Sequence, residues 1–324
     1  YSPSGTVLMS SNGEKIVSSY DKNVYFFDQS ESPTWTYQVT ESGGISGLEM
    51  SSDGQYLVII TGGVRDKLLF FNTDLAFPLW TFESPKSQVG GTETQGTIAS
   101  VALSQDGSRI VIGTHSGRVY LFDKDSNIPL WIYDRSYDEN HPSYHFKGFY
   151  DVDISEDGQY IVAGKFRQLI YFEHSSNVPL WIYDTSNFPD SYEEIAIFNT
   201  VKVSPDGQYT LGATNTTLLL FSKESNEILG THSFDSFGRY NHSLGGLHSY
   251  GGISSITISY NSEYVAASSW AGEIFFFSLD DFNLIWEYEE ENIGFDLSIS
   301  SDGNYLIAGT MFNFVNYGND INGR

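Results

Sequence analysis

The chain has 324 residues, of which 40% are hydrophobic and 16% aromatic, and 41 acidic against 16 basic residues give it a formal net charge of −25. This balance predicts no nucleic-acid partner and no anionic membrane partner, because both require clustered Lys and Arg. The chain contains no cysteine, which excludes disulfides, thiolate metal sites and cysteine nucleophiles. It also lacks any apolar run of about 18 residues, so no membrane insertion is expected from this segment.

A turn of the form Ser-x-Asp-Gly recurs along the chain, and each copy introduces a similar series of apolar runs. The copies are spaced 41 to 55 residues apart, about the length of one four-stranded propeller blade. In chain order the turns lie at Asn12-Gly13, Asp53-Gly54, Asp106-Gly107, Asp157-Gly158, Asp206-Gly207, a degenerate Asn261-Ser262, and Asp302-Gly303.

The third unit illustrates how one copy is expected to fold. Its apolar and aromatic runs are short and are separated by turn residues, which is typical of antiparallel strands joined as a meander. The expected strands lie at 97–104, 109–113, 118–123 and 129–133. Glycine at the Asp-Gly position supplies the positive φ of a tight turn, and Asp tolerates such a φ.

The third run of nearly every unit is continuously apolar, as in Val119-Tyr120-Leu121-Phe122. Continuous apolarity indicates a strand covered on both faces. The fourth run carries Pro-Leu-Trp-x-Tyr or a variant, and its proline favours an outer edge strand, which can forgo one backbone hydrogen bond. Five of the six tryptophans belong to this motif, at Trp35, Trp80, Trp131, Trp181 and Trp286, whereas the fifth copy has Ile228-Leu229-Gly230 instead.

These units predict an all-β fold: a seven-bladed β-propeller with four-stranded antiparallel blades, forming a single domain over residues 1–324. The Asp-Gly turn followed by a Val-Tyr-Leu-Phe-Asp-type strand resembles WD repeats, and Pro-Leu-Trp-x-Tyr resembles the tryptophan segment of quinoprotein-like propellers. The resemblance spans essentially the whole chain. The Gly-His and Trp-Asp dipeptides of typical WD repeats are missing, so the buried His-Asp network of that family is not expected here.

The ring has a seam at its ends. Tyr1 aligns with the tyrosine of Trp-x-Tyr, and the seventh unit has no fourth run after residues 312–317. We therefore expect the outer strand of the last blade to come either from residues upstream of Tyr1, within a longer chain, or from another chain by strand exchange. The second possibility would make the protein a self-associating subunit of a surface structure.

Four connections between blades are longer than the rest, at 83–96, 134–148, 184–196 and 234–252. All four join an outer strand to the next inner strand, so strand order places them on one face of the propeller. Long loops on a rigid scaffold are where recognition usually takes place. The opposite face, with its uniform turns, is expected to be scaffold.

Two of these loops are rich in aromatic, arginine and histidine residues. The Tyr and Arg side chains offer large contact areas with hydrogen-bonding tips, which suits a protein or glycan partner, although tyrosines could instead pack over the channel. The expected partner-binding residues are Arg135, Tyr137, Tyr144, Arg239, Tyr240 and Tyr250. A divalent metal site is a further possibility, with His141, His145, His242 and His248 joined by Asp138 or Glu139.

The sequence thus favours a noncatalytic propeller that serves as a protein-interaction or cell-surface scaffold and requires no cofactor. The resemblance to quinone-binding propellers implies an alternative, a quinone- or metal-dependent dehydrogenase, and a lyase or hydrolase acting at the central channel is another. No catalytic motif supports either of them. Composition favours an extracellular or cell-surface location over a cytoplasmic one, and Asn215 and Asn241 lie in N-glycosylation sequons.

Overall fold

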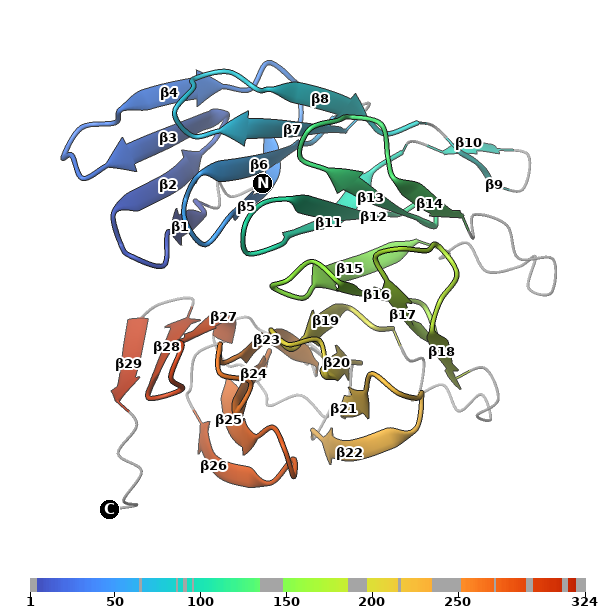
Figure 1. The fold of residues 1–324 in the computed structure, drawn as a ribbon. Coiled ribbons are helices and arrows are strands. Elements are labelled where there is room, and N and C mark those ends of the chain that lie inside the picture. Colours follow the sequence, from blue (N-terminus) through green and yellow to red (C-terminus); the bar gives the residue numbers. More distant parts are fainter. Residues whose placement is uncertain are drawn as a thin grey trace, which may run out of the picture. The chain divides into compact units, whose positions relative to one another are not determined.

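The chain is all-β and is built from repeated, propeller-like antiparallel blades (Figure 1). It divides into two compact units, residues 1–163 with 173–178, and residues 164–172 with 179–324. The computed structural model describes residues 5–63, 66–85, 87–89, 92–94, 96–134, 148–185, 197–214, 217–234, 252–270, 272–289, 294–310 and 314–318.

Six four-stranded sheets lie within the described residues, and each runs in simple chain order. The first three are β1 (Val7–Met9), β2 (Lys15–Tyr20), β3 (Asn23–Asp28) and β4 (Trp35–Gln38); β5 (Ile45–Met50), β6 (Tyr56–Thr61), β7 (Lys67–Asn72) and β8 (Trp80–Glu83); and β11 (Ile98–Leu103), β12 (Arg109–Thr114), β13 (Arg118–Asp123) and β14 (Trp131–Asp134).

The next three are β15 (Phe149–Ile154), β16 (Tyr160–Lys165), β17 (Gln168–Glu173) and β18 (Trp181–Asp184); β19 (Thr200–Val203), β20 (Tyr209–Ala213), β21 (Thr217–Ser222) and β22 (Ile228–Ser233); and β23 (Ile253–Ile258), β24 (Tyr264–Ser269), β25 (Glu273–Ser278) and β26 (Leu284–Glu289). The described residues also hold a three-stranded sheet of β27 (Gly294–Ile299), β28 (Tyr305–Thr310) and β29 (Phe314–Gly318), and a hairpin of β9 (Ser87–Val89) and β10 (Thr92–Thr94).

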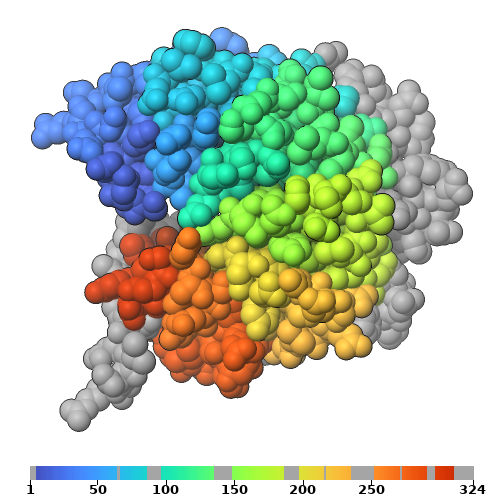
Figure 2. Space-filling model, viewed as in Figure 1, coloured from blue at the N-terminus to red at the C-terminus, as the bar shows by residue number. Residues whose placement is uncertain are grey.

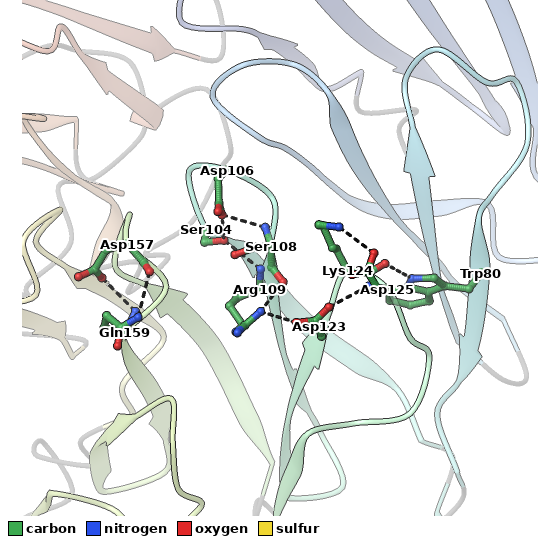
Figure 3. A network of polar contacts seen from close by, with 10 residues as sticks. All are labelled: Trp80, Ser104, Asp106, Ser108, Arg109, Asp123, Lys124, Asp125, Asp157 and Gln159. Carbon is green, nitrogen blue, oxygen red and sulfur yellow. Dashed lines mark hydrogen bonds and ion pairs between the residues drawn. The ribbon is translucent and has the colours of Figure 1, made fainter.

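The repeated turn between the first and second strands has the same geometry in all seven copies. In the third copy Ser104 Oγ donates to Asp106 Oδ1 at 2.9 Å, the same oxygen accepts the Ser108 amide at 2.9 Å, and the Arg109 amide donates to Ser104 Oγ at 3.0 Å (Figure 3). Gly107 takes a φ of 69°. The sequence prediction was right about glycine and wrong about Asp, which keeps a negative φ and acts through its carboxylate instead.

The degenerate sixth copy keeps this turn without glycine. Ser262 adopts a φ of 56°, and Asn261 Oδ1 accepts the Ser259 hydroxyl at 2.6 Å. The side-chain hydrogen bonds therefore determine the turn as much as glycine does.

Both faces of the second sheet are covered, which explains its continuous apolar runs. Leu57, Ile59, Leu69 and Phe71 pack with residues of the first sheet, while the alternate residues Val58, Ile60, Leu68 and Phe70 pack with residues of the third sheet. Successive side chains of a strand point to opposite faces of the sheet, and here both faces are buried. The third strand of the first sheet is different, because only Val24 and Phe26 are fully buried there.

Each motif tryptophan connects its sheet to the next one. The indole of Trp80 stacks on Phe70 of its own sheet with ring centroids 4.9 Å apart and lies 5.8 Å from Phe122 of the next sheet. Its Nε1 donates to the Lys124 backbone oxygen at 2.7 Å (Figure 3). The same bond recurs from Trp35 to Thr73, Trp131 to His174 and Trp181 to Lys223. The outer strands β4, β8, β14 and β18 begin at the tryptophan, two residues after the proline.

The fifth copy, which lacks tryptophan, fills the same space from the neighbouring sheet. A Cβ at Gly230 would overlap the ring of Phe282, which precedes β26. Phe282 stacks on Phe277 at 5.0 Å with an interplanar angle of 8°. The aromatic layer is thus kept, although the ring comes from a different part of the sequence.

Within each unit the first strands of successive sheets are neighbours. In the first unit β1 contacts β5, β5 contacts β11 and β11 contacts β15; in the second, β19 contacts β23 and β23 contacts β27. In the view of Figure 2, the sheets of the first unit follow one another as adjacent blue, cyan and green bands. This succession of blades within each unit is the local pattern that the sequence predicts. The count of seven blades and the single closed ring stay predictions.

Candidate interaction site

The two ends of each sheet differ in character. We call the end with the Ser-x-Asp-Gly turn and the third-to-fourth connection the turn end. We call the other end, with the second-to-third hairpin and the end of the outer strand, the loop end. The Ser-x-Asp-Gly turns of the turn ends share one geometry, whereas the loop ends carry different residues in each sheet, among them Tyr20, Asp66, His115, Arg167 and Trp270.

The loop end of the second sheet is extended by an extra hairpin. β9 and β10 pair antiparallel within the predicted 83–96 connection, with Thr92 opposite Val89 (Figure 1). The greater part of the other three connections falls outside the described residues. The predicted contact residues Arg135, Tyr137, Tyr144, Arg239, Tyr240 and Tyr250, the predicted metal ligands His141, His145, His242 and His248, and the sequon residues Asn215 and Asn241 all lie there too.

Asp66 holds the base of the 83–96 connection. Its side chain is buried, and Oδ2 accepts the backbone amide of Ile98, the first residue of β11, at 2.9 Å. Its backbone oxygen accepts the amide of Ser84 at 3.1 Å. Burial raises the pKa of this carboxyl, against the effect of the backbone amides of Ile98 and Gly63 that bind it. Asp66 therefore joins the β6–β7 hairpin to the end of the outer strand β8 and to β11 of the next sheet.

Close backbone contacts fix the residues where the expanded connections rejoin the sheets. A Cβ at Gly96 would lie 2.7 Å from Ser84 Oγ, and a Cβ at Gly148 would overlap the backbone of His115. Only glycine fits at either position without displacing the backbone. The connections at 83–96 and 134–148 are thus anchored tightly at their ends.

His115 and Tyr150 form an aromatic pair beside the second of these anchors. Their rings lie 6.0 Å apart in an edge-to-face arrangement, and His115 is exposed. The backbone amide of His115 donates to the Thr97 oxygen at 3.0 Å, which fixes the hairpin against the start of β11. Burial raises the pKa of the Tyr150 phenol. The pair presents an imidazole and a phenol that are held in place, which suits hydrogen bonding to a partner.

Acidic residues lie at the ends of the outer strands and pair across to the third strands. Arg118 Nε donates to Asp134 Oδ2 at 2.7 Å, and Gln168 Nε2 donates to Asp184 Oδ2 at 2.5 Å. These contacts place carboxylates where the 134–148 and 184–196 connections leave their sheets. Arg118 therefore partly compensates the charge of Asp134, and both carboxylates are held in a defined orientation.

The second unit has its own aromatic and cationic group at the loop end. Arg167, at a φ of 61°, has its guanidinium carbon 5.4 Å from the ring centroid of Phe166, within the range of a cation–π contact. The Thr185 amide donates to the Arg167 oxygen at 2.9 Å, which joins this hairpin to the end of β18. Trp270, the one tryptophan outside the repeat motif, occupies the corresponding hairpin of the sixth sheet, and its amide donates to the Gly252 oxygen at 2.9 Å.

These residues were not singled out from the sequence. Their roles depend on amides and rings that are distant in the chain, such as Ile98 for Asp66 and Tyr150 for His115. The sequence offers one general signal for the loop end: the residues of the second-to-third hairpin differ from copy to copy, whereas those of the Ser-x-Asp-Gly turn recur.

The described residues contain no group of three or more His, Asp or Glu side chains arranged to hold a metal ion. No helix among them is both long enough and apolar enough to cross a membrane. No protein-family model matches the chain, and no curated protein is significantly similar to it.

Proposed function

We propose that the protein is a noncatalytic, seven-bladed β-propeller that binds a protein or glycan partner through its loop ends. The connections at 83–96, 134–148, 184–196 and 234–252 would supply most of the contacts. We further propose that the module works at the cell surface or outside the cell as a scaffold and needs no cofactor.

The observation that carries this proposal is the contrast between the two ends of the sheets. The turn ends repeat one hydrogen-bonded geometry, from Ser10 with Asn12 to Ser300 with Asp302. The loop ends instead carry the added β9–β10 hairpin and different aromatic or charged residues in each sheet. Variation on a constant frame is the arrangement expected when one end of a scaffold recognises a partner.

The residues exposed at the loop ends fit polar partners with flat or ring-shaped surfaces. Tyr20 is 59% exposed, and the His115–Tyr150 pair and the Arg167–Phe166 contact lie at corresponding ends of other sheets. Aromatic rings with hydrogen-bonding tips provide contact area at low entropic cost, both to proteins and to sugars.

Site-specific photo-crosslinking tests the proposal. A photoreactive amino acid is placed at Tyr20 or His115 at the loop end, or at Glu14 at the turn end as the matched exposed control, and the protein is irradiated in extracts of its source cells. We expect a discrete crosslinked product from the loop-end positions only. The same preparations applied to a glycan array would show whether the partner is a sugar.

A variant with residues 83–96 replaced by a short turn serves as the second control. If products form equally from Glu14, then the loop end is not the binding surface. If His115 gives the same product with the shortened connection, then residues 83–96 are not part of that surface.

A further inference from the structure

The outer strands carry a row of exposed aliphatic side chains, one in each of five successive sheets. The residue directly before the motif tryptophan, or before Gly230 in the fifth copy, is always Leu or Ile in sheets two to six, and it is about half exposed each time. The outer row comprises Leu79 at 47%, Leu130 at 52%, Leu180 at 51%, Leu229 at 55% and Ile285 at 49% exposed.

Packing inside the sheets does not account for this row. Aliphatic side chains left half in water gain little from folding, and single ones are common on any surface. The fifth copy is informative, because it has lost the tryptophan that packs between sheets and yet keeps Leu229. In this copy the exposed aliphatic residue is present although the buried tryptophan is not.

An exposed acidic residue accompanies most members of the outer row, five positions earlier in the chain. It lies in the connection between the third and fourth strands, at the turn end. The pairs are Asp74 with Leu79, Asp125 with Leu130, Glu224 with Leu229, and Asp280 with Ile285. Asp125 also pairs with Lys124 at 2.7 Å, but its side chain remains 76% exposed.

Neighbouring members of the row are held in fixed register. Between the second and third sheets, the Trp80 indole bonds to the Lys124 oxygen at 2.7 Å, and Asn127 Nδ2 donates to the Thr81 oxygen at 3.0 Å (Figure 3 shows the first of these). In the second unit Trp181 and Asn226 make the corresponding bonds to Lys223 and Ile182. Within each unit the acidic and aliphatic groups therefore recur at a set interval along the neighbouring outer strands.

We propose that the outer row of each unit, taken separately and with its acidic residues, is a docking surface for a basic polypeptide segment that carries aliphatic side chains. The aliphatic groups of the partner would cover the row of one unit. Its Lys or Arg side chains would meet Asp74 and Asp125 in the first unit, or Glu224 and Asp280 in the second. A second copy of this chain is a poor match, because it would bring like charges together, and the net charge of −25 opposes an anionic lipid surface. This surface is separate from the loop ends.

Binding of three short synthetic peptides to the full chain tests the proposal, with fluorescence anisotropy as the readout at low and high salt. The first peptide contains Leu and Lys, the second Ser and Lys, and the third Leu and Glu. We expect the Leu/Lys peptide to bind best and to weaken with salt. The double variant Leu79→Ser, Leu130→Ser should bind the Leu/Lys peptide about tenfold more weakly, which is the scale expected for the loss of two partly buried aliphatic anchors. The double variant Asp74→Asn, Asp125→Asn should weaken this binding by a smaller factor.

Ile307→Ser is the matched control, since Ile307 is 49% exposed but lies outside the row. It should leave affinity unchanged, and urea unfolding should show that all variants remain folded. The proposal fails if the Leu/Lys peptide binds no better than the other two, or if the row variants bind as the wild type does. It also fails if the row substitutions instead abolish self-association in sedimentation velocity or binding to phosphatidylserine vesicles.

Discussion

At the scale of single residues, the repeated turn shows how a short polar side chain replaces a backbone interaction. The Asp or Asn oxygen accepts both a serine hydroxyl and a backbone amide, as in Ser51 with Asp53 at 2.7 Å and Gln55 with Asp53 at 2.8 Å. At Asp302 the same kind of donors stabilise the charged form of the carboxylate, so this turn makes the stability of the fold depend on pH.

Asp302 allows this dependence to be measured. Hydrogen bonds from the Ser300 hydroxyl, and then from Asn304, lower the pKa of Asp302 from 3.8 to about 2. A carboxyl with a lowered pKa stabilises the fold above pH 3.8, and this contribution is lost as the pH falls through about 2. Asp302→Asn copies the natural turns at Asn12 and Asn261 and removes the titration. We expect the melting temperature of the variant to be close to that of the wild type at neutral pH and to fall less steeply as the pH decreases below 3.8. An equally steep fall in melting temperature for both proteins would contradict this.

His232 should produce a second pH effect, at a higher pH. It occupies the position of the tyrosine in Trp-x-Tyr and contacts the rings of Phe234, Phe275 and Phe277 at 5.1, 4.9 and 5.1 Å. Burial lowers its pKa below 6.5, against the opposing charges of Glu287 and Glu273. The neutral imidazole is therefore the stable form in the fold, and stability should decline as the pH falls below 6.5.

The variant His232→Tyr should remove that decline, because it restores the residue of other copies without a group that titrates in this range. Melting temperatures of the wild type and the variant, measured from neutral to mildly acidic pH, give the comparison. Parallel curves for the two proteins would show that His232 does not titrate in this way.

At the scale of elements, sheets are joined by aromatic stacking and by single hydrogen bonds at their outer strands. Trp80→Phe separates these two contributions, because phenylalanine keeps the stacking on Phe70 but loses the bond to the Lys124 oxygen. We expect a loss of about 1–2 kcal/mol in the free energy of unfolding, measured by urea titration with circular dichroism. Trp80→Leu, which removes the stacking as well, should cost more. Equal stability of Trp80→Phe and the wild type would show that the hydrogen bond contributes little.

Gly230 and Phe282 provide a test of coupling between neighbouring sheets. Gly230→Ala should cost about 1–3 kcal/mol, since its methyl group would overlap the Phe282 ring. Phe282→Ala should cost about 2–4 kcal/mol through the cavity that it leaves. In the double variant the added methyl occupies part of that cavity, so we expect the total to fall short of the sum by about 1 kcal/mol. If the free energies of unfolding were strictly additive, Phe282 would not fill the space that the missing tryptophan leaves at Gly230.

At the scale of the whole molecule, the sequence predicted the repeated parts well because a pattern that recurs in several copies is a stronger signal than one that occurs once. The turns, the doubly covered third strands and the edge position of the fourth strands all follow from short local patterns. The β9–β10 hairpin was not predicted, since Ser87–Val89 and Thr92–Thr94 match no repeated pattern. The role of Asp66 also escaped prediction because its partner amide is 32 positions away.

The predicted contact residues between 135 and 147 and between 235 and 251 remain predictions. Nothing in a single sequence determines how non-repeating connections are arranged, because no second copy constrains them. The repeat therefore predicts the scaffold and marks the positions of its exceptions, but it does not predict their structure.

The most direct test of the central claim is to separate folding from binding. In one variant, residues 87–94, 135–147, 186–196 and 235–251 are each replaced by a short turn, which leaves Ser84, Gly96, Gly148 and Phe234 in place. The melting temperature of this variant is measured together with its binding to the partner that crosslinks at the loop end. The proposed function predicts a folded protein with a melting temperature close to that of the wild type and with binding lost. A folded variant that still binds this partner would contradict it.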